Sequence, residues 1–414
     1  MLQDIVPGTE EQLQKELTTA YIGFDPTADS LHIGSLVPIL LLLHFQKAGH
    51  KPIALIGGAT GMVGDPSGKS EERNLLTEQQ LEDNIRGINN QLRKSLDFDS
   101  GKPNTAEMVN NYDWFKDLSF IHFLRDVGKH ITVNYMMSKD SVRKRIEGDT
   151  GISYTEFAYQ LMQGYDFYWL FKNKNCKMQM GGSDQWGNIT TGAELIRRKA
   201  SSDAFAFTCP LITKADGGKF GKTEKGNIWL DPEKTSPYQF YQFWLNASDA
   251  DAEKWIKIFT FLPKDEIDQL LLKHSADPAA RILQKKLAEH VTEFIHGRQE
   301  FDKAIETTSK LFANQSAPIE TLSIEDLESL EGVVKFDFSL NRLNEEIDIV
   351  SFLAEAGIFS SKGEARKMVQ SGGLSLNRSK VGEVGLKLNK EFLLHEKYLL
   401  VQKGKKNYYL IKVE

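Results

Sequence analysis

The most constraining feature of this sequence is a strand–helix–strand pattern between residues 19 and 58. Two short apolar runs, "TAYIGFD" and "PIALIGG", have the length and composition of strands, and each closes near glycine. The segment between them, "SLVPILLLLHFQKAGH", has helix length, is apolar on nearly all sides, and ends with Gly49 followed by Pro52. Such a helix is buried, so the pattern predicts a βαβ unit and with it a parallel sheet.

Further segments continue this alternation. "SEERNLLTEQQLEDNIRGINNQLRKSL" is typical of an amphipathic helix, and "KMQMGGSDQ" of a strand that runs into a glycine turn, followed by the helical "WGNITTGAELIRRKA". We therefore predict a Rossmann-like, parallel-sheet α/β domain over residues 1–235.

Beyond residue 236 the pattern changes to helices alone, in "SPYQFYQFWLNA", "DAEKWIKIFTFL" and "AARILQKKLAEHVTEFIHG". We predict an all-α domain over 236–325, a polar linker over 326–341, and a small α+β domain over 342–414. In the last, Ser361 and Glu364 fit a capping box, a helix ends at Gly372 and Gly373, and "LSLN" alternates like a strand.

Charge is distributed unevenly along the chain. The net charge is −6, but residues 351–414 carry 12 Lys/Arg against 6 Asp/Glu, which leaves −12 on the first 350 residues. A small basic module on an acidic body is a recurring form of nucleic-acid-binding appendage. A solvated basic surface is the alternative interpretation.

The cysteines and the apolar segments indicate the cellular compartment of the protein. Cys176 and Cys209 are the only two cysteines and neither lies in a paired motif, which argues against a disulfide framework and a Cys-based zinc site. The longest apolar run, "LVPILLLLHF", has about half the length that spans a bilayer. No cationic, apolar leader opens the sequence, so we expect a cytoplasmic protein.

The glycine-rich segment "GGATGMVGDPSGKS", residues 57–70, suggests a phosphate-binding loop at first sight. A Walker A loop needs Gly-x-x-x-x-Gly-Lys-Ser, and counting back from Gly68 places Val63 where the first glycine belongs. Gly64 is one residue too late. A P-loop NTPase is therefore disfavoured, also because no convincing Walker B partner is present.

Three segments compete for the carboxyl ends of the predicted strands, where ligands of such folds bind. In "YIGFDPTADSLHIGS" a strand ends at Gly23 and a helix is expected to begin near residues 30–32, so its N-terminal N–H groups favour an anion. His32 and Thr27 would add side-chain donors, and Gly34 permits close approach of a ligand. The alternative is a capped helix whose His32 packs on a neighbour.

The other two segments carry different chemistry. In "QMGGSDQWGN" two glycines let a flat ring or a sugar lie against the backbone, and Asp184 can accept hydrogen bonds from ribose hydroxyls. In "TKADGGKFGKTEKGNIW" Lys219, Lys222 and Thr223 lie in a glycine-rich loop able to close over a polyphosphate. An ordinary glycine turn and an ordinary surface loop are the respective alternatives.

Together the segments resemble the class I aminoacyl-tRNA synthetases. "HIGS" stands where that family has its HIGH motif, with Ser35 in place of the second histidine, and "KFGKT" where it has KMSKS. Within the class the chain is similar to the bacterial tyrosine-specific synthetases in "YIGFDPTADSLHIG", "GGATGMVGDPSGK", "NNYDWF", "FLRDVGKH", "GGSDQWGN" and "PLITKADGGKFGKTE". The tail resembles an RNA-binding module that a small-subunit ribosomal protein shares with this family.

The resemblance implies a site for each substrate. Residues expected to act on the phosphates are His32, Thr27, Lys219, Lys222, Thr223, Lys69 and Arg73. Tyr21 and Asp166 are expected on the substrate phenol, and Tyr159, Gln163 and Asp65 at its α-amino group. Residues expected to contact ATP or the adenylate are Gly23, Asp25, Gly34, Gly182, Asp184, Gln185 and Lys222. Independently, Tyr159, Gln163 and Asp166 have the spacing of one helix face.

The implied activity is that of a tyrosine-tRNA ligase with L-tyrosine, ATP and tyrosine tRNA as substrates. Magnesium is expected to arrive on the pyrophosphate part of ATP, with no protein-held metal, because no carboxylate cage is visible in the sequence. A dimer-forming insertion is expected around 100–145, where aromatic and apolar content is generous, and hence a homodimer. The alternative function is a catalytically silent, synthetase-derived RNA-binding or regulatory protein.

Overall fold

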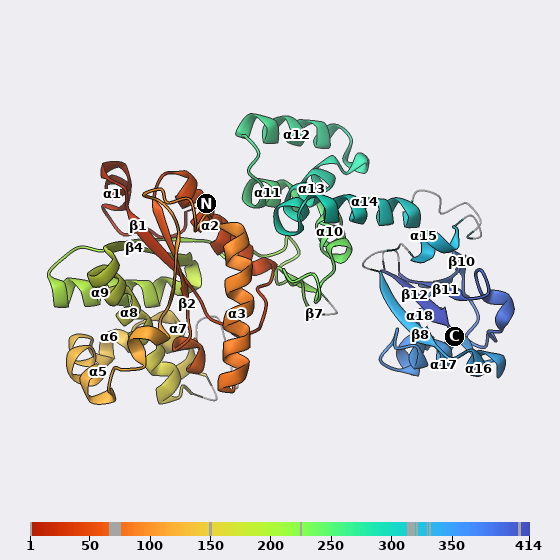
Figure 1. The fold of residues 1–414 in the computed structure, drawn as a ribbon, viewed down its shortest axis with the longest axis horizontal. Helices are drawn as coiled ribbons and strands as arrows, with labels where there is room; N and C mark the ends of the chain where they lie inside the picture. The colour runs from red at the N-terminus through yellow and green to blue at the C-terminus, as the bar shows by residue number, and fades with distance from the viewer. Residues whose placement is uncertain are drawn as a thin grey trace. The chain divides into compact units, whose positions relative to one another are not determined.

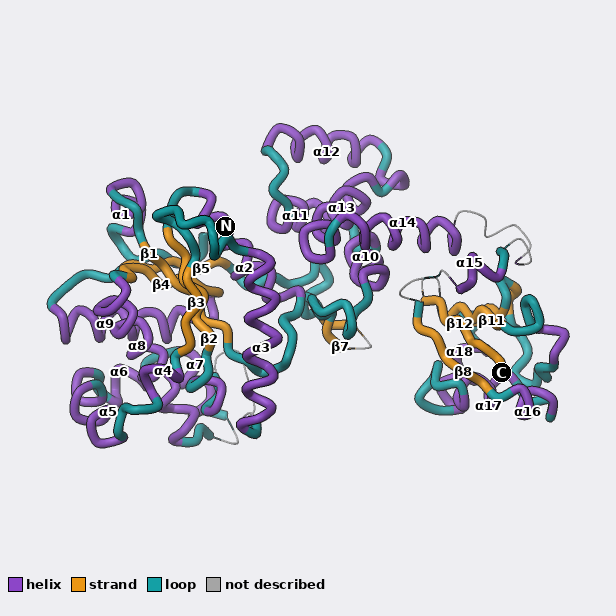
Figure 2. The backbone as a smooth tube through the Cα atoms, in the orientation of Figure 1, coloured by secondary structure: helices purple, strands orange, loops and turns teal. Residues whose placement is uncertain are grey.

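The computed structural model describes residues 2–65, 76–148, 151–223, 226–312, 322–328, 333–404 and 407–414, with residues 319 and 330 between them. The chain separates into two compact units, Met1–Asp231 and Pro232–Glu414. Each unit is described by itself below, with the element labels of Figures 1 and 2.

The first unit is built on a five-stranded sheet in which every neighbouring pair is parallel. Its strands are β1 (Thr19–Phe24), β2 (Lys51–Ile56), β3 (Glu107–Asn110), β4 (Cys176–Gly182) and β5 (Phe205–Cys209). Their order is β3-β2-β1-β4-β5, so the chain winds outward in one direction from β1 and in the other from β4. The predicted Rossmann-like parallel sheet is confirmed.

Two pairs of helices cover the sheet. They are α2 (Leu36–Lys47) with α3 (Glu78–Ser95), and α8 (Tyr154–Lys174) with α9 (Trp186–Ala200). Within each pair the helices contact each other. Connections between parallel strands are right-handed, and the strand order reverses direction between β3 and β4, so the two pairs cover opposite faces of the sheet (Figure 2). The buried helix predicted after the first strand is α2, which has Ile39 and Leu42 in its core.

Local sequence signals fix the ends of these helices. The side chain of Thr77 accepts from the N–H of Gln80 and the side chain of Gln80 accepts from Thr77, a complete capping box ahead of α3. The side chain of Ser153 caps α8 by accepting from the N–H of Glu156. Where α8 and α9 cross, Gly164 and Gly192 lie face to face, and a Cβ on Gly192 would come within 2.9 Å of Phe167. These glycines let the two helices approach closely.

An insertion of short helices separates β3 from α8. Its elements are α4 (Tyr112–Phe115), α5 (Phe120–Asp126), η3 (Gly128–His130), α6 (Val133–Met137) and α7 (Asp140–Ile146). The first unit also contains α1 (Thr9–Lys15), η1 (Ile33–Ser35), η2 (Thr60–Met62), η4 (Ser183–Gln185) and the two-stranded ribbon β6 (Lys222–Thr223) and β7 (Gly226–Asn227).

The second unit begins with helices. They are α10 (Pro237–Leu245), α11 (Asp249–Phe259), α12 (Lys264–Ala276), η5 (Pro278–Ala280), α13 (Ile282–His296) and α14 (Arg298–Phe312). The all-α character predicted after residue 236 is present, with Trp244 and Trp255 buried in the core of these helices.

A small mixed sheet follows, ordered β10-β9-β11-β12-β8. Its elements are α15 (Ile324–Glu328), β8 (Val334–Phe338), α16 (Leu340–Asn344), α17 (Ile349–Glu355), α18 (Lys362–Gln370), β9 (Leu374–Leu376), β10 (Ser379–Lys380), η7 (Lys390–Phe392), β11 (Tyr398–Lys403) and β12 (Asn407–Val413). As predicted, Ser361 caps a helix that ends before Gly372 and Gly373, although the Glu364 carboxylate accepts from Ser360 rather than completing the box.

The predicted linker over 326–341 differs from the structure. Val334–Phe338 forms β8, which pairs in parallel with β12 along its whole length. The small sheet therefore begins before residue 342. Elsewhere, none of the helices in the described part of the chain combines the length and apolar character needed to cross a membrane.

Candidate active site

The candidate site lies at the carboxyl ends of β1 and β4, the two strands at which the winding of the sheet reverses. Ligands of doubly wound folds bind there because the loops that follow the two strands diverge. Gly23 is the one exposed residue of the otherwise buried β1. Among described residues, a Cβ on Gly23 would meet only Leu55, at an ordinary 3.8 Å, so packing does not require this glycine and its surface is open to a ligand.

Tyr21 and Asp166 form a deep polar end of the site. Both are almost completely buried, and the Tyr21 hydroxyl has no hydrogen-bond partner among the described residues. Burial raises the pKa of Asp166 to about 8, and burial together with the nearby Asp166 carboxyl raises the pKa of Tyr21 well above its usual value. An unpaired buried hydroxyl costs free energy, so this end of the site is suited to a ligand that brings its own polar group.

Two side chains hold the Asp166 carboxyl in place. Trp114 Nε1 donates to Oδ1 at 2.9 Å, and Asn111 Nδ2 donates to Oδ2 at 3.1 Å. Trp114 also stacks on Trp169, with ring centroids 4.2 Å apart. Neither Asn111 nor Trp114 is among the residues expected from sequence, although both lie in the segment "NNYDWF" that carries part of the resemblance.

A second cluster joins the glycine-rich turn after β2 to α8 and α9. Gln185 Nε2 donates to Asp65 Oδ2 at 2.8 Å, and Asn188 Nδ2 donates to Asp65 Oδ1 at 3.4 Å. Asn188 also donates to Gln163 Oε1 at 3.0 Å. Asp184 adjoins this cluster, and burial raises the pKa of its carboxyl. The structure thus brings Asp65, Gln163, Asp184 and Gln185 together, and it adds Asn188, which the sequence analysis missed.

Tyr159 lies among the carboxyl groups of the site. Its hydroxyl donates to Asp25 Oδ2 at 2.7 Å, and Thr60 donates to Asp25 Oδ1 at 2.8 Å. Burial raises the pKa of Tyr159 well above its usual value, and the charges of Asp25, Asp65 and Asp166 act in the same direction. Several carboxyl groups close to one buried side chain favour a cation such as an ammonium group.

Two glycines of the turn after β2 lie against polar side chains. A Cβ on Gly57 would lie 2.0 Å from Asp25 Oδ1, and a Cβ on Gly58 would lie 2.2 Å from Asn110 Oδ1. These two glycines therefore make room for side chains of the protein itself, not for substrate.

The helix expected to begin near residues 30–32 begins later. His32 precedes the short η1, and α2 starts at Leu36. His32 Nδ1 accepts from the N–H of Gly34 at 3.0 Å, so the neutral ring carries its proton on Nε2. A Cβ on Gly34 would lie 2.7 Å from this ring, so Gly34 accommodates His32 itself.

The loop that carries Lys219 lies beside His32. Ile33 N–H donates to Ile228 at 2.9 Å, and Leu230 N–H donates to Leu31 at 2.8 Å. Gly221 has φ +80, and a Cβ there would lie 2.9 Å from Ile33. The structure thus joins the two expected nucleotide signatures, which are almost 190 residues apart in sequence.

Several expected phosphate-binding residues are only partly described. Lys69 and Arg73 lie outside the described residues, and Lys222 and Thr223 are described through their backbone in β6 alone. Lys219 and Thr27 are exposed. Gly182 ends β4 two residues before Asp184, whose carboxyl lies 2.6 Å from where a Cβ on Gly182 would be. Among the residues that the structure describes, no group of three or more His, Cys, Asp and Glu side chains could hold a metal ion.

Known proteins match nearly the whole chain. A family model described as tRNA synthetases class I (W and Y) matches residues 13–313, and one described as a tyrosine--tRNA ligase SYY-like C-terminal domain matches residues 329–411. The chain is 59% identical over 416 residues to a tyrosine--tRNA ligase of Bacteroides fragilis, covering 99% of this chain and 97% of that protein. It is also 59% identical over 420 residues to one of Porphyromonas gingivalis, covering 100% and 97%.

A solved structure shows the same architecture. The C-terminally truncated mitochondrial tyrosyl-tRNA synthetase of Aspergillus nidulans superimposes with a TM-score of 0.67 at 30% identity, over 75% of this chain and 91% of that one. The resemblance inferred from sequence motifs is thereby confirmed. The family model covers most of the chain, and the identity to the two bacterial ligases extends over nearly all of it. This chain therefore belongs to the class I tRNA synthetases (W and Y).

Proposed function

We propose that this protein is a tyrosine-tRNA ligase, which activates L-tyrosine with ATP and transfers the tyrosyl group to tyrosine tRNA. The observation that carries the proposal is the buried pair of Tyr21 and Asp166, whose unpaired hydroxyl and fixed carboxyl suit a substrate phenol. Identity of 59% over nearly the whole chain to tyrosine--tRNA ligases supports it.

The first step is a displacement at phosphorus. A carboxylate oxygen of tyrosine forms a bond to the α-phosphorus of ATP while the bond to the β-phosphate oxygen breaks, giving tyrosyl-adenylate and pyrophosphate. The nucleophile is already an anion, so no general base and no covalent enzyme intermediate are needed. Catalysis then depends on positioning and on donors directed at the charge that develops on the phosphates.

The donors proposed for this step are His32, Thr27, Lys219, Lys222, Thr223, Lys69 and Arg73. His32 supports the assignment best, because its bond from Gly34 leaves Nε2 carrying the proton at the start of α2. Gly23, Asp25, Gly34, Gly182, Asp184 and Gln185 would line the nucleotide. Magnesium would enter as part of the ATP substrate, bound through the phosphates.

Amino-acid selection follows from the polar ends of the pocket. A tyrosine phenol would pair with Tyr21 and Asp166, while its ammonium group would be held by Asp65, Gln163 and Tyr159 among the carboxyl groups. A phenylalanine ring in the same place would bring no polar group to Asp166 and would leave the buried Tyr21 hydroxyl unpaired, which costs about 1–3 kcal/mol. In the second step the terminal adenosine hydroxyl of tRNA attacks the tyrosyl carbonyl carbon and AMP leaves.

The test is exchange of labelled pyrophosphate into ATP, run separately with tyrosine and with phenylalanine. We expect exchange that depends on tyrosine and is much weaker with phenylalanine at equal concentration. Lack of exchange with either amino acid would instead favour a catalytically silent RNA-binding or regulatory protein. That alternative is disfavoured by the intact Tyr21–Asp166 pair.

We further propose that the protein is a homodimer joined through the insertion between β3 and α8. Large apolar side chains are exposed there at Phe120, Ile121, Leu124, Val133 and Met137, and at Tyr154 at the start of α8. Several large exposed apolar side chains in one short segment favour an interface. Light scattering is expected to give twice the 46.8 kDa of one chain.

A pair of matched variants sharpens this test. Ile121 is 68% exposed on the insertion and Leu272 is 71% exposed on α12. Ile121→Glu should shift the mass toward one chain, whereas Leu272→Glu should leave it unchanged.

The basic C-terminal residues are proposed to bind tyrosine tRNA, and the cytoplasm is the proposed location.

A further inference from the structure

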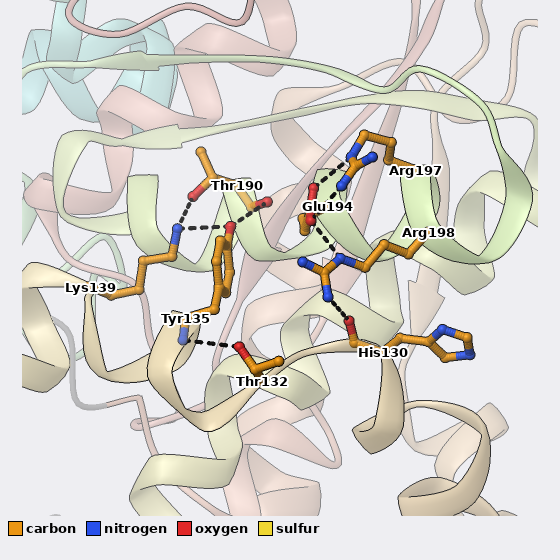
Figure 3. A network of polar contacts seen from close by, with 8 residues as sticks. All are labelled: His130, Thr132, Tyr135, Lys139, Thr190, Glu194, Arg197 and Arg198. Carbon is orange, nitrogen blue, oxygen red and sulfur yellow. Dashed lines mark hydrogen bonds and ion pairs between the residues drawn. The ribbon is translucent and has the colours of Figure 1, made fainter.

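Helix α9 contacts the candidate site on one side and the insertion on the other. Gln185, which precedes it, and Asn188, in its first turn, both donate to Asp65. Thr190 lies two residues beyond Asn188 and faces the insertion, where its Oγ1 accepts from Lys139 Nζ at 2.9 Å (Figure 3). The first turn of α9 is therefore held from both sides.

Lys139 and Tyr135 form the outer hold. Lys139 Nζ donates to the Tyr135 hydroxyl at 2.9 Å and lies 4.0 Å from the centre of the Tyr135 ring. The Tyr135 hydroxyl in turn donates to the Thr190 carbonyl at 3.3 Å. The Lys139 stem runs past Gly187, where an added Cβ would meet Lys139 Cβ at 3.5 Å. Ammonium, hydroxyl and backbone carbonyl thus make one connected contact on the first turn of α9.

The same segment of the insertion follows α9 toward its other end. Arg198 donates to the His130 carbonyl at 2.6 Å, and Glu194 binds both Arg197 and Arg198. Figure 3 shows the two contact groups side by side along the helix. Between them Leu195 packs in one apolar cluster with Val127, Ile131 and Met136. The insertion is therefore fixed along the outer face of α9.

Helix α6 connects this contact to the exposed surface. Its Met136 is buried against α9, and its Tyr135 makes the polar contact just described. Val133 and Met137, one turn apart, are exposed and belong to the surface proposed for dimerisation. One short helix therefore carries both the contact to α9 and part of the exposed apolar surface.

We propose that Lys139, acting with Tyr135, is a positioning residue for tyrosine activation: it fixes the first turn of α9 so that Gln185 and Asn188 meet Asp65. In this way it connects the insertion to the amino-group end of the site. The inference deepens the proposed function and rests on it.

The experiment is pyrophosphate exchange on the full chain with Lys139→Met, which keeps the alkyl stem on Gly187 and removes the donor. The KM for tyrosine should rise by about fivefold to tenfold, while kcat and the KM for ATP change by less than about twofold. Lys139→Arg, which keeps a donor, should restore most of the affinity. Lys129→Met, on the same insertion, removes the same charge from an exposed side chain and should behave as wild type.

A double-mutant cycle with Thr190→Val identifies the path. The two changes remove the same contact, so together they should raise the tyrosine KM scarcely more than either alone. An unchanged tyrosine KM in Lys139→Met, or an effect confined to the tRNA KM, would overturn the positioning role. If wild type itself showed no tyrosine-dependent exchange, the proposed function would fail instead, and the two failures are thereby distinguished. Equal losses of all parameters with a lowered melting temperature would also overturn it.

Discussion

At the proposed phenol end of the site, Tyr21 and Asp166 are almost completely buried and two side chains fix the carboxyl group. At the proposed phosphate end, Lys219 is exposed on a loop held through backbone hydrogen bonds. The first arrangement selects by desolvation, because any wrong ligand leaves buried polar groups unpaired. The second supplies charge to a ligand that water can still reach.

The two ends of the site differ in when their contacts are needed during the reaction. Recognition of a neutral phenol needs geometry that exists before the ligand arrives, and buried hydrogen bonds provide it. Stabilisation of phosphates in a transition state needs cations near the reacting atoms at one moment only. Changes at the phenol end should therefore alter tyrosine affinity, and changes at the phosphate end should alter the rate.

The largest effect is expected from Asp166→Ala. It removes the proposed partner of the phenol, leaves the buried Trp114 Nε1–H without an acceptor, and leaves Asn111 Nδ2 with the Thr60 hydroxyl alone. We expect kcat/KM for tyrosine to fall by about 2–4 kcal/mol, a factor of about 30 to 1,000, with the KM for ATP within about twofold. Pyrophosphate-exchange kinetics measure kcat/KM for tyrosine and the KM for ATP.

Trp114→Phe removes one donor to Asp166 and keeps an aromatic ring, so it should lower kcat/KM for tyrosine by about tenfold. Equal losses for tyrosine and ATP would break the comparison.

The next effect is expected from Lys219→Met at the exposed end. Removing one cation directed at the developing phosphate charge should lower kcat by about 100-fold while the KM for tyrosine stays within about twofold. Single-turnover formation of tyrosyl-adenylate is the measurement. Lys214→Met, earlier in the same loop, serves as the control for loss of charge alone. A rise in tyrosine KM with unchanged kcat would contradict the division between the two ends.

A smaller effect is expected from Gly221→Ala, for which the loop provides a matched control. Gly221 and Gly217 have nearly the same left-handed φ, +80 and +81, but only Gly221 packs on a neighbour, Ile33 beside His32. Gly221→Ala and Gly217→Ala each carry backbone strain of about 1–2 kcal/mol. Gly221→Ala must also move Ile33, so its KM for ATP should rise by about tenfold. The KM of Gly217→Ala for ATP should rise by about twofold. Equal values would show that contact with Ile33 does not position the loop.

The fold was predictable where local patterns are strong. The apolar segment that became α2, flanked by two strands, determined the parallel sheet because a helix buried on all sides requires strands on one face and helices beside it. The strand β8 was missed inside a polar linker, although "VKFDF" alternates apolar and charged residues like a strand. Its acidic, polar neighbourhood obscured a pattern of only five residues.

The site was predictable where chemistry and spacing coincide. Tyr159, Gln163 and Asp166 follow one helix face, and in the structure they contact Asp25, Asn188 and Trp114, respectively, around the candidate site. Asn111 and Trp114 were not assigned because they act on Asp166 from more than 50 residues away in sequence. Contacts of that separation depend on tertiary packing, which local periodicity does not encode.

The smallest effect tests burial at the phenol end through pH. Burial raises the pKa of Asp166 from an ordinary 3.8 to about 8, so between these values the unfolded chain releases a proton that the folded chain keeps. The folded state then binds more protons than the unfolded state, and stability falls as pH rises from about 4 to about 8. Asp166→Asn has no such proton. Its urea midpoint relative to wild type should therefore increase steadily from pH 5 to pH 8 and level off above. A constant difference in urea midpoint across that range would mean that Asp166 ionises as a solvated carboxyl does. The proposed phenol end would then be as accessible to water as the proposed phosphate end.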